Sequence, residues 1–154
     1  MLRILPSIVL VAGSMLAAPE ARAHCQVPCG IYDDHARVQQ LREDVSTIAK
    51  AVKELAALNA KTDVQSRQQV VRWVVTKEAH AEKIMRTISD YFLAQKIPPA
   101  SAKDKNAHAA YLERLTRHHA VLVAAMKCKQ SAAMEPVIAL GKTIDAIDKY
   151  WPAK

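Results

Sequence analysis

The 154-residue chain is predicted to be an all-α protein, an antiparallel four-helix bundle preceded by an irregular N-terminal segment. Three observations favour this fold class. Apolar residues after position 33 recur at spacings of three and four, which is the periodicity of an amphipathic helix. No segment shows the alternation that is typical of a strand. The four periodic segments are joined by short connections, which favour antiparallel neighbours in a bundle.

The first two helices are predicted from their caps and apolar faces. Asp33 or Asp34 can cap the first helix and Asp63 the second, because a carboxylate accepts hydrogen bonds from the N–H groups of a first turn. The second helix is expected to run to about Lys96, before the two prolines at 98–99. The expected core faces are Val38, Leu41, Val45, Ile48, Val52 and Leu55, followed by Val70, Val74, Lys77, Ala81, Ile84, Ile88 and Tyr91.

The third and fourth helices follow a polar connection over residues 100–105. Pro136 marks the start of the fourth helix, because proline is tolerated in a first turn. Their expected core faces are Leu112, Leu115, His119, Leu122 and Met126, and then Val137, Leu140, Ile144, Ile147 and Trp151. His119 is therefore interpreted as a core histidine and Cys128 as a half-buried free thiol. The remaining candidates are interpreted as surface, packing or subunit-contact residues: His35, His80, His108, Trp73 and Trp151.

The first 23 residues have the composition of an export leader. Arg3 precedes an apolar run over residues 4–18, and Ala21-Arg22-Ala23 is a small-residue cleavage signal. The run is too short for a transmembrane helix of about 20 apolar residues. A signal peptide or other cleaved leader is therefore expected, with no stable membrane insertion after cleavage.

This interpretation divides the chain into three parts and predicts its location. Residues 1–23 are the leader, residues 24–32 form an irregular hook, and residues 33–154 form the bundle. The mature protein is expected to be exported, periplasmic or secreted. A cytoplasmic protein with a cleaved propeptide is the alternative.

The charge of the chain favours small anionic partners. The leader holds two of the 22 Lys and Arg residues and one of the 15 Asp and Glu residues, so cleavage lowers the formal charge from +7 to +6. Such a charge attracts small anions. Because the basic residues are interleaved with acidic ones and do not cluster, no nucleic-acid binding is expected.

Cleavage before His24 would assemble a complete set of metal ligands. The α-amine of His24 and the backbone nitrogen of Cys25 close one five-membered chelate ring, and the same nitrogen and the Cys25 thiolate close a second. Cys29 can return a second thiolate, because the flanking residues Pro28 and Gly30 favour a tight turn. The His24 imidazole remains as an axial ligand, so the sequence predicts an irregular N-terminal metal-binding hook.

The ligand types indicate which metal the hook would bind. Planar nitrogen coordination favours Ni(II) or Cu(II) over the tetrahedral geometry of zinc. Cu(II) tends to oxidise thiolates, so nickel is the best candidate. Thiolates and a deprotonated amide stabilise a higher oxidation state, which suits a one-electron substrate. A disulfide between Cys25 and Cys29 in an oxidising compartment is the alternative.

The motif His24-Cys25-x-x-Pro28-Cys29-Gly30-x-Tyr32 resembles the nickel hook of the nickel-containing superoxide dismutase family. Weaker similarity continues at Ser89-Asp90-Tyr91-Phe92 and at Ile144-x-x-Ile147-Asp148-Lys149. The resemblance implies a four-helix bundle assembled as a homohexamer, with one nickel ion per subunit. It also implies that His24 (amine and imidazole), Cys25 (backbone nitrogen and thiolate) and Cys29 (thiolate) are the metal ligands, and that Tyr32 and Tyr91 border the substrate approach.

The activity implied by the resemblance is the disproportionation of superoxide to O2 and H2O2 by Ni(III)/Ni(II) cycling. A maturation protease and a nickel chaperone are the further partners expected. The chain departs from the family in two places. Gln26 replaces an aspartate, and Gln39 and Gln40 lie where the family has a glutamate beside the axial imidazole. Arg72 and Lys77 are the candidates for the basic partner of that imidazole.

Two other functions remain open at this stage. A nickel or copper carrier could use the same N-terminal chelate without turnover. A purely structural bundle could have a hook closed by a disulfide. Tyr32 could anchor the hook as well as border the site, and Tyr91 could serve only in core packing.

Overall fold

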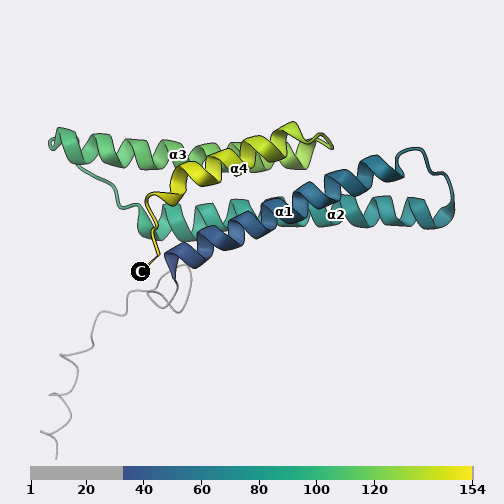
Figure 1. The fold of residues 1–154 in the computed structure, drawn as a ribbon. Helices are drawn as coiled ribbons and strands as arrows, with labels where there is room; N and C mark the ends of the chain where they lie inside the picture. Colours follow the sequence, from purple (N-terminus) through teal and green to yellow (C-terminus); the bar gives the residue numbers. More distant parts are fainter. Residues whose placement is uncertain (1–32, 154) are drawn as a thin grey trace, which may run out of the picture.

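The computed structural model describes residues 33–153, and over that range the chain is helical and has no strand. The helices are α1 (Asp34–Leu58), α2 (Val64–Arg86), the π-helical η1 (Thr87–Lys96), α3 (Lys105–Gln130) and α4 (Glu135–Asp148). The predicted all-α four-helix bundle is confirmed (Figure 1). The predicted leader, 1–23, and hook, 24–32, lie outside the described residues. None of the helices within 33–153 combines the length and apolarity needed to span a bilayer.

The bundle consists of two antiparallel hairpins. α1 pairs with α2, whose axis continues into η1, and α3 pairs with α4 (Figure 1). The connection between α1 and α2 lies at one end. The start of α1, the end of η1 and the segment after α4 meet at the other end, where the His35 ring bonds the backbone of Trp151. We call this the hook end, comprising residues 33–37, 91–96 and 149–153, because residue 32 joins the bundle there.

Aspartates cap three of the helices, as a first turn with free N–H groups requires. Asp33, rather than Asp34, caps α1, because its carboxylate accepts the N–H groups of His35 at 2.8 Å and Ala36 at 3.2 Å. Asp63 caps α2 as predicted, with the Ser66 N–H at 2.9 Å. Asp104 caps α3. Each such cap contributes about 1 kcal/mol.

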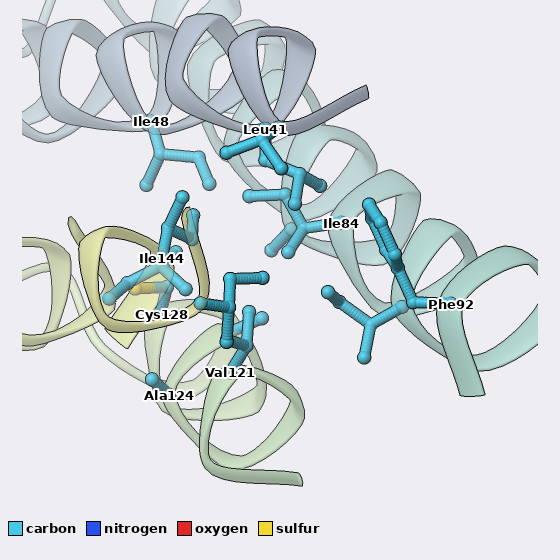
Figure 2. Close-up of a cluster of buried hydrophobic side chains, with 14 of the residues drawn as sticks. Leu41, Ile48, Ile84, Phe92, Val121, Ala124, Cys128 and Ile144 are labelled. Carbon is cyan, nitrogen blue, oxygen red and sulfur yellow. The ribbon is translucent and has the colours of Figure 1, made fainter. Parts of the chain in front are cut away.

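The core lies between the two hairpins, where apolar side chains of all the helices interdigitate (Figure 2). The predicted faces of α1, α2 and α4 are confirmed by buried residues, although Val45, Leu55, Val70 and Val74 are only half-buried. Trp151 is buried and therefore belongs to the core. The buried members of these faces are Val38, Leu41, Ile48, Val52, Lys77, Ala81, Ile84, Ile88, Tyr91, Val137, Leu140, Ile144, Ile147 and Trp151.

The predicted core face of α3 is wrong by one position. The buried residues are His118, Val121, Ala124, Ala125 and Cys128. The predicted face is half-buried or exposed: Leu112, Leu115, His119, Leu122 and Met126. The helix has two adjacent apolar stripes, and the one with smaller residues faces inward because alanines let the neighbouring helices approach closely. Ranking by hydrophobicity selects the larger side chains and therefore the wrong stripe.

This shift changes the interpretation of two side chains. His118, not His119, is the core histidine. Cys128 is fully buried, with 1% of its surface exposed, whereas a half-buried thiol was predicted. His35 and His80 are partly exposed and each has a polar partner, which for His80 is the buried carboxylate of Asp44 at 2.7 Å.

The last ten residues of the second helix adopt π-helical geometry, which the sequence did not indicate. A π-turn holds more residues than an α-turn, and its hydrogen bonds join residues five apart. Tyr91 and Phe92, which are adjacent in this segment, are both buried. Lys96, five residues after Tyr91, places its ammonium 5.3 Å from the centre of the Tyr91 ring. The π-helix thus brings a cation and a phenol together at the hook end.

A buried lysine caps the C-terminus of α3. The Nζ of Lys77 donates to the carbonyl oxygens of Cys128 at 2.6 Å, Lys129 at 2.8 Å and Ser131 at 2.9 Å. These carbonyls have no partner within the helix, and the positive charge lies at the negative end of the helix dipole. Burial lowers the pKa of Lys77.

Replacement Lys77→Met is expected to lower the free energy of unfolding by about 3 kcal/mol. Methionine fills a similar volume but leaves three carbonyl groups, one buried and two partly buried, without this donor. Urea denaturation followed by circular dichroism measures the effect. Lys127→Met, at an exposed position in the last turn of α3, is the control and is expected to cost less than about 0.5 kcal/mol. Equal effects of the two substitutions would contradict the capping role.

Candidate metal centre

The predicted ligands His24, Cys25 and Cys29, together with Tyr32, lie outside the described residues. The covalent chain nevertheless limits where a site built on them can be. Cys29 precedes Asp33 by four residues, and four residues span at most about 14 Å. The relevant surroundings are therefore those of the hook end.

Residues 33–153 offer no alternative metal site. No group of three or more His, Cys, Asp or Glu side chains in this range could hold a metal ion. Cys128 is buried, and burial raises the pKa of its thiol to about 11. The donors predicted in residues 24–29 therefore have no competing group among the described residues, and nitrogen and sulfur donors of this kind suit nickel.

Cys128 is expected to react slowly with iodoacetamide in the folded protein. A rise in pKa from 9.0 to about 11 lowers the thiolate fraction at pH 8 about 100-fold, and only the thiolate reacts. Peptide mass spectrometry of protein labelled for increasing times measures this rate. In nickel-free, reduced protein, Cys25 and Cys29 serve as internal references. Labelling of Cys128 as fast as either of them would contradict the buried position.

Tyr91 lies at the hook end within a cluster of charged groups. Its hydroxyl donates a hydrogen bond to the carboxylate of Asp34 in the first turn of α1. The Nζ of Lys96 lies 3.0 Å from the same carboxylate oxygen. The guanidinium of Arg37 lies 6.0 Å from the centre of the Tyr91 ring. The ring is 2% exposed, so Tyr91 packs in the core and also fixes the first turn of α1 against η1.

The glutamines near the expected axial position both have partners on α1. The Gln39 amide donates to the Nε2 of His35 at 2.9 Å, and the Gln40 oxygen accepts from Arg37 at 2.7 Å. The opposite ring nitrogen of His35 donates to the carbonyl of Trp151 at 3.1 Å. These bonds join the first turns of α1 to the segment after α4.

The two candidates for the basic partner of the imidazole lie away from the hook end. Lys77 is bonded to the end of α3 and precedes Tyr91 by fourteen residues, about 20 Å along a helix. Arg72 lies still nearer the start of α2. Among the described residues, the cations closest to Tyr91 are instead Arg37 and Lys96. Sequence reasoning missed both, because the position of Lys96 depends on the π-helix.

His118 and Trp151 close the core beside this cluster. The Nδ1–H of His118 donates to the carbonyl of Arg114 at 2.8 Å, and its Nε2 accepts the indole N–H of Trp151 at 3.1 Å. Both ring nitrogens are therefore used by a neutral imidazole. Burial lowers the pKa of His118, in agreement with the neutral form.

This lowered pKa makes stability depend on pH. Below about pH 6.5, the ordinary value, the unfolded chain binds a proton at His118 that the folded chain does not. Stability should therefore fall as the pH decreases from about 6.5 towards the lowered pKa of the folded state. Urea midpoints across this range measure the effect, and His118→Gln is expected to reduce the pH dependence. The control is His119→Gln at the exposed neighbouring position, which should not change the pH dependence of the urea midpoint. The same pH dependence in both variants would contradict the role assigned to His118.

The fold is a small helical bundle, and the metal-binding donors that the sequence predicts precede its first helix. Comparison with known families identifies it further. The family model described as nickel-containing superoxide dismutase matches residues 19–154. The chain therefore belongs to the nickel-containing superoxide dismutase family. No curated protein and no solved structure gave a significant match.

Membership of this family confirms several predictions made from the hook motif. The protein is a superoxide dismutase, an oxidoreductase that acts on superoxide, and its cofactor is nickel. The match covers both the hook segment and all the helices. The resemblance first seen in residues 24–32 therefore extends over most of the chain.

Proposed function

We propose that this protein disproportionates superoxide at a nickel ion held by its processed N-terminus. The ligands are the amine and imidazole of His24, the backbone nitrogen and thiolate of Cys25, and the thiolate of Cys29. One observation carries this proposal. The segment with these donors falls within the family match, and residues 33–153 contain no competing group of ligands.

The bound nickel would supply a one-electron Ni(III)/Ni(II) couple, and the chain supplies ligands, charge and protons. Superoxide is an anion, and the mature charge of +6 favours its approach. Arg37 and Lys96 place two of these charges beside Tyr91 at the hook end. Tyr32 borders the approach, and the ring of Tyr91 lies buried beside these two charges. The two protons required for H2O2 come from Tyr32, ordered water or a ligand thiol.

Maturation is part of the proposed function, because the amine of His24 exists only after cleavage. An export leader over residues 1–23 gives a periplasmic or secreted protein. A cytoplasmic protein whose propeptide is removed by a dedicated protease is the alternative. In either case a nickel chaperone or early metal loading would keep Cys25 and Cys29 from forming a disulfide.

The subunits are proposed to assemble as a homohexamer, each with one nickel ion. Apolar side chains exposed on three helices support contacts between copies of the chain. Val64, Val71 and Val75 on α2 are 82%, 63% and 62% exposed. Leu112 and Met126 on α3 and Ile138 on α4 are exposed as well. Native mass spectrometry of the nickel-loaded protein measures the number of subunits.

The decisive experiment is isolation of the native protein, followed by N-terminal sequencing, nickel analysis and an assay of superoxide consumption. We expect a first residue His24, one nickel ion per subunit and rapid consumption of superoxide. Tight nickel or copper binding without consumption would favour the carrier. A metal-free chain with a Cys25–Cys29 disulfide would favour the structural alternative. An active protein that starts at any other residue would overturn the proposed ligand set.

A further inference from the structure

Five rings at the hook end form a continuous series across the bundle, which we call the aromatic chain. The centres of Tyr91 and Phe92 on η1 are 5.1 Å apart, and Phe92 lies 4.9 Å from Trp151. Trp151 lies 5.8 Å from His118, and His118 lies 6.2 Å from Tyr150. Figure 2 shows Phe92 projecting from its helix into the core. The series thus leads from the α1–η1 side of the bundle to the α3–α4 side.

Both ends of the aromatic chain are tyrosines bonded to carboxylates. The Tyr91 hydroxyl donates to Asp34, and the Tyr150 hydroxyl donates to Glu113 at 2.8 Å. A hydrogen bond from Lys149, and then that from Tyr150, hold the pKa of Glu113 below its usual value, so this carboxylate is ionised at neutral pH. A phenol that loses an electron becomes a strong acid. Each tyrosine therefore has an acceptor for the proton it must release on one-electron oxidation.

The middle of the aromatic chain holds a readily oxidised indole. Trp151 is 7% exposed, and its N–H donates to the Nε2 of His118. Tyr91 and Trp151 are buried, whereas Tyr150 is half-buried and is reached by solvent. A soluble reductant can therefore meet an oxidised side chain at Tyr150 but not at the other two.

We propose that the aromatic chain conducts single electrons from Tyr150 at the surface to the hook end. There the electrons reduce strong oxidants. The inference rests on the proposed function, because a hook that produces H2O2 is the source of a peroxide-derived one-electron oxidant. The oxidant gains one electron from Tyr91 and is reduced, as a hydroxyl radical is reduced to hydroxide, while the phenol proton of Tyr91 passes to Asp34.

The remaining steps restore both tyrosines and balance the electrons. One electron moves through Trp151 to Tyr91, Asp34 returns the proton, and Tyr150 becomes the radical as its own proton passes to Glu113. A soluble thiol or ascorbate then gives one electron to Tyr150, and Glu113 returns the proton. The net change is transfer of one electron from the soluble reductant to the oxidant at the hook end. The hook thiolates are thereby protected from oxidation by this oxidant.

The test uses nickel-free protein, so its result does not depend on dismutase activity. A ruthenium polypyridyl photo-oxidant is attached to Cys29 in a Cys25→Ser chain, while Cys128 stays unmodified because it is buried. A light flash in the presence of a sacrificial electron acceptor generates one oxidising equivalent at the hook. A spin trap and peptide mass spectrometry then locate the radical. We expect the adduct mainly on Tyr150.

Two further variants of the labelled chain decide the route. Trp151→Phe keeps an aromatic ring but removes the oxidisable indole, so most of the Tyr150 adduct should be lost. The radical should instead stay on buried Tyr91, where freeze-quench electron paramagnetic resonance detects it without a trap. Tyr150→Phe should abolish the adduct and leave an indole radical on buried Trp151, which the same spectroscopy identifies. Trp73→Phe, outside the aromatic chain, is the matched control and should change nothing. An unchanged Tyr150 adduct in Trp151→Phe, or an equal loss in Trp73→Phe, would overturn the proposal while leaving the dismutase function intact.

Discussion

A mature chain with one extra alanine before His24 is expected to lose at least about 100-fold in superoxide consumption. The added residue converts the His24 amine into an amide and so removes one of the proposed nickel ligands. Loss of groups that merely orient metal ligands costs 10–100-fold in affinity or activity, so loss of a ligand should cost at least as much. The bundle should remain folded, because the change precedes Asp33, the cap of α1.

Three measurements on the same preparation separate the possible outcomes. Nickel content and superoxide consumption report on the site, and circular dichroism with urea denaturation reports on the bundle. The control is a chain with one alanine added after Lys154, which contains the same extra residue but leaves the amine free. Full activity of the N-terminally extended protein with bound nickel would show that the amine is not a ligand.

Replacement Trp151→Ala is expected to lower the free energy of unfolding by about 4 kcal/mol. Truncating a buried aromatic side chain typically costs 3–5 kcal/mol, because apolar burial is lost and a cavity remains. Trp151 packs on Phe92 with ring centres 4.9 Å apart. Its loss also leaves the Nε2 of His118 without its indole donor.

Urea denaturation at neutral pH measures this change. Trp151→Phe retains most of the packing and should cost about half as much. Trp73→Ala, at a half-buried position beside Lys50, should also cost less than Trp151→Ala, because less surface is buried there. If Trp73→Ala proved as costly as Trp151→Ala, the hook end would not depend on Trp151 for its packing.

The parts of the fold that were predicted correctly depend on short-range patterns. Asp63 and Pro136 mark helix starts through local hydrogen bonding and backbone geometry, so they can be recognised without knowledge of the fold. The apolar faces of α1, α2 and α4 each form one dominant stripe. In α3, where Leu122 and Val121 lie on competing stripes, periodicity alone cannot choose. Close packing against the other helices selects Val121 and its smaller neighbours.

The candidate site likewise has a part that local sequence predicts and a part that only the packing of the helices decides. The predicted ligands His24, Cys25 and Cys29 fall within six consecutive residues, and a chelate of that size can be inferred from spacing and donor chemistry. The groups around Tyr91 come from distant parts of the chain. Asp34 and Tyr91, which are hydrogen-bonded, lie 57 positions apart in the sequence. The position of Lys96 depends on a π-helix that no local sequence pattern indicated.

The linear chain thus specifies the helices and their aspartate caps, and it predicts the nickel ligands, because each of these depends on residues a few positions apart. Folding in three dimensions specifies the inner face of α3, the lysine cap on its last turn and the aromatic chain from Tyr91 to Tyr150. Those features require side chains from different helices to meet, with distances set by packing rather than by sequence separation.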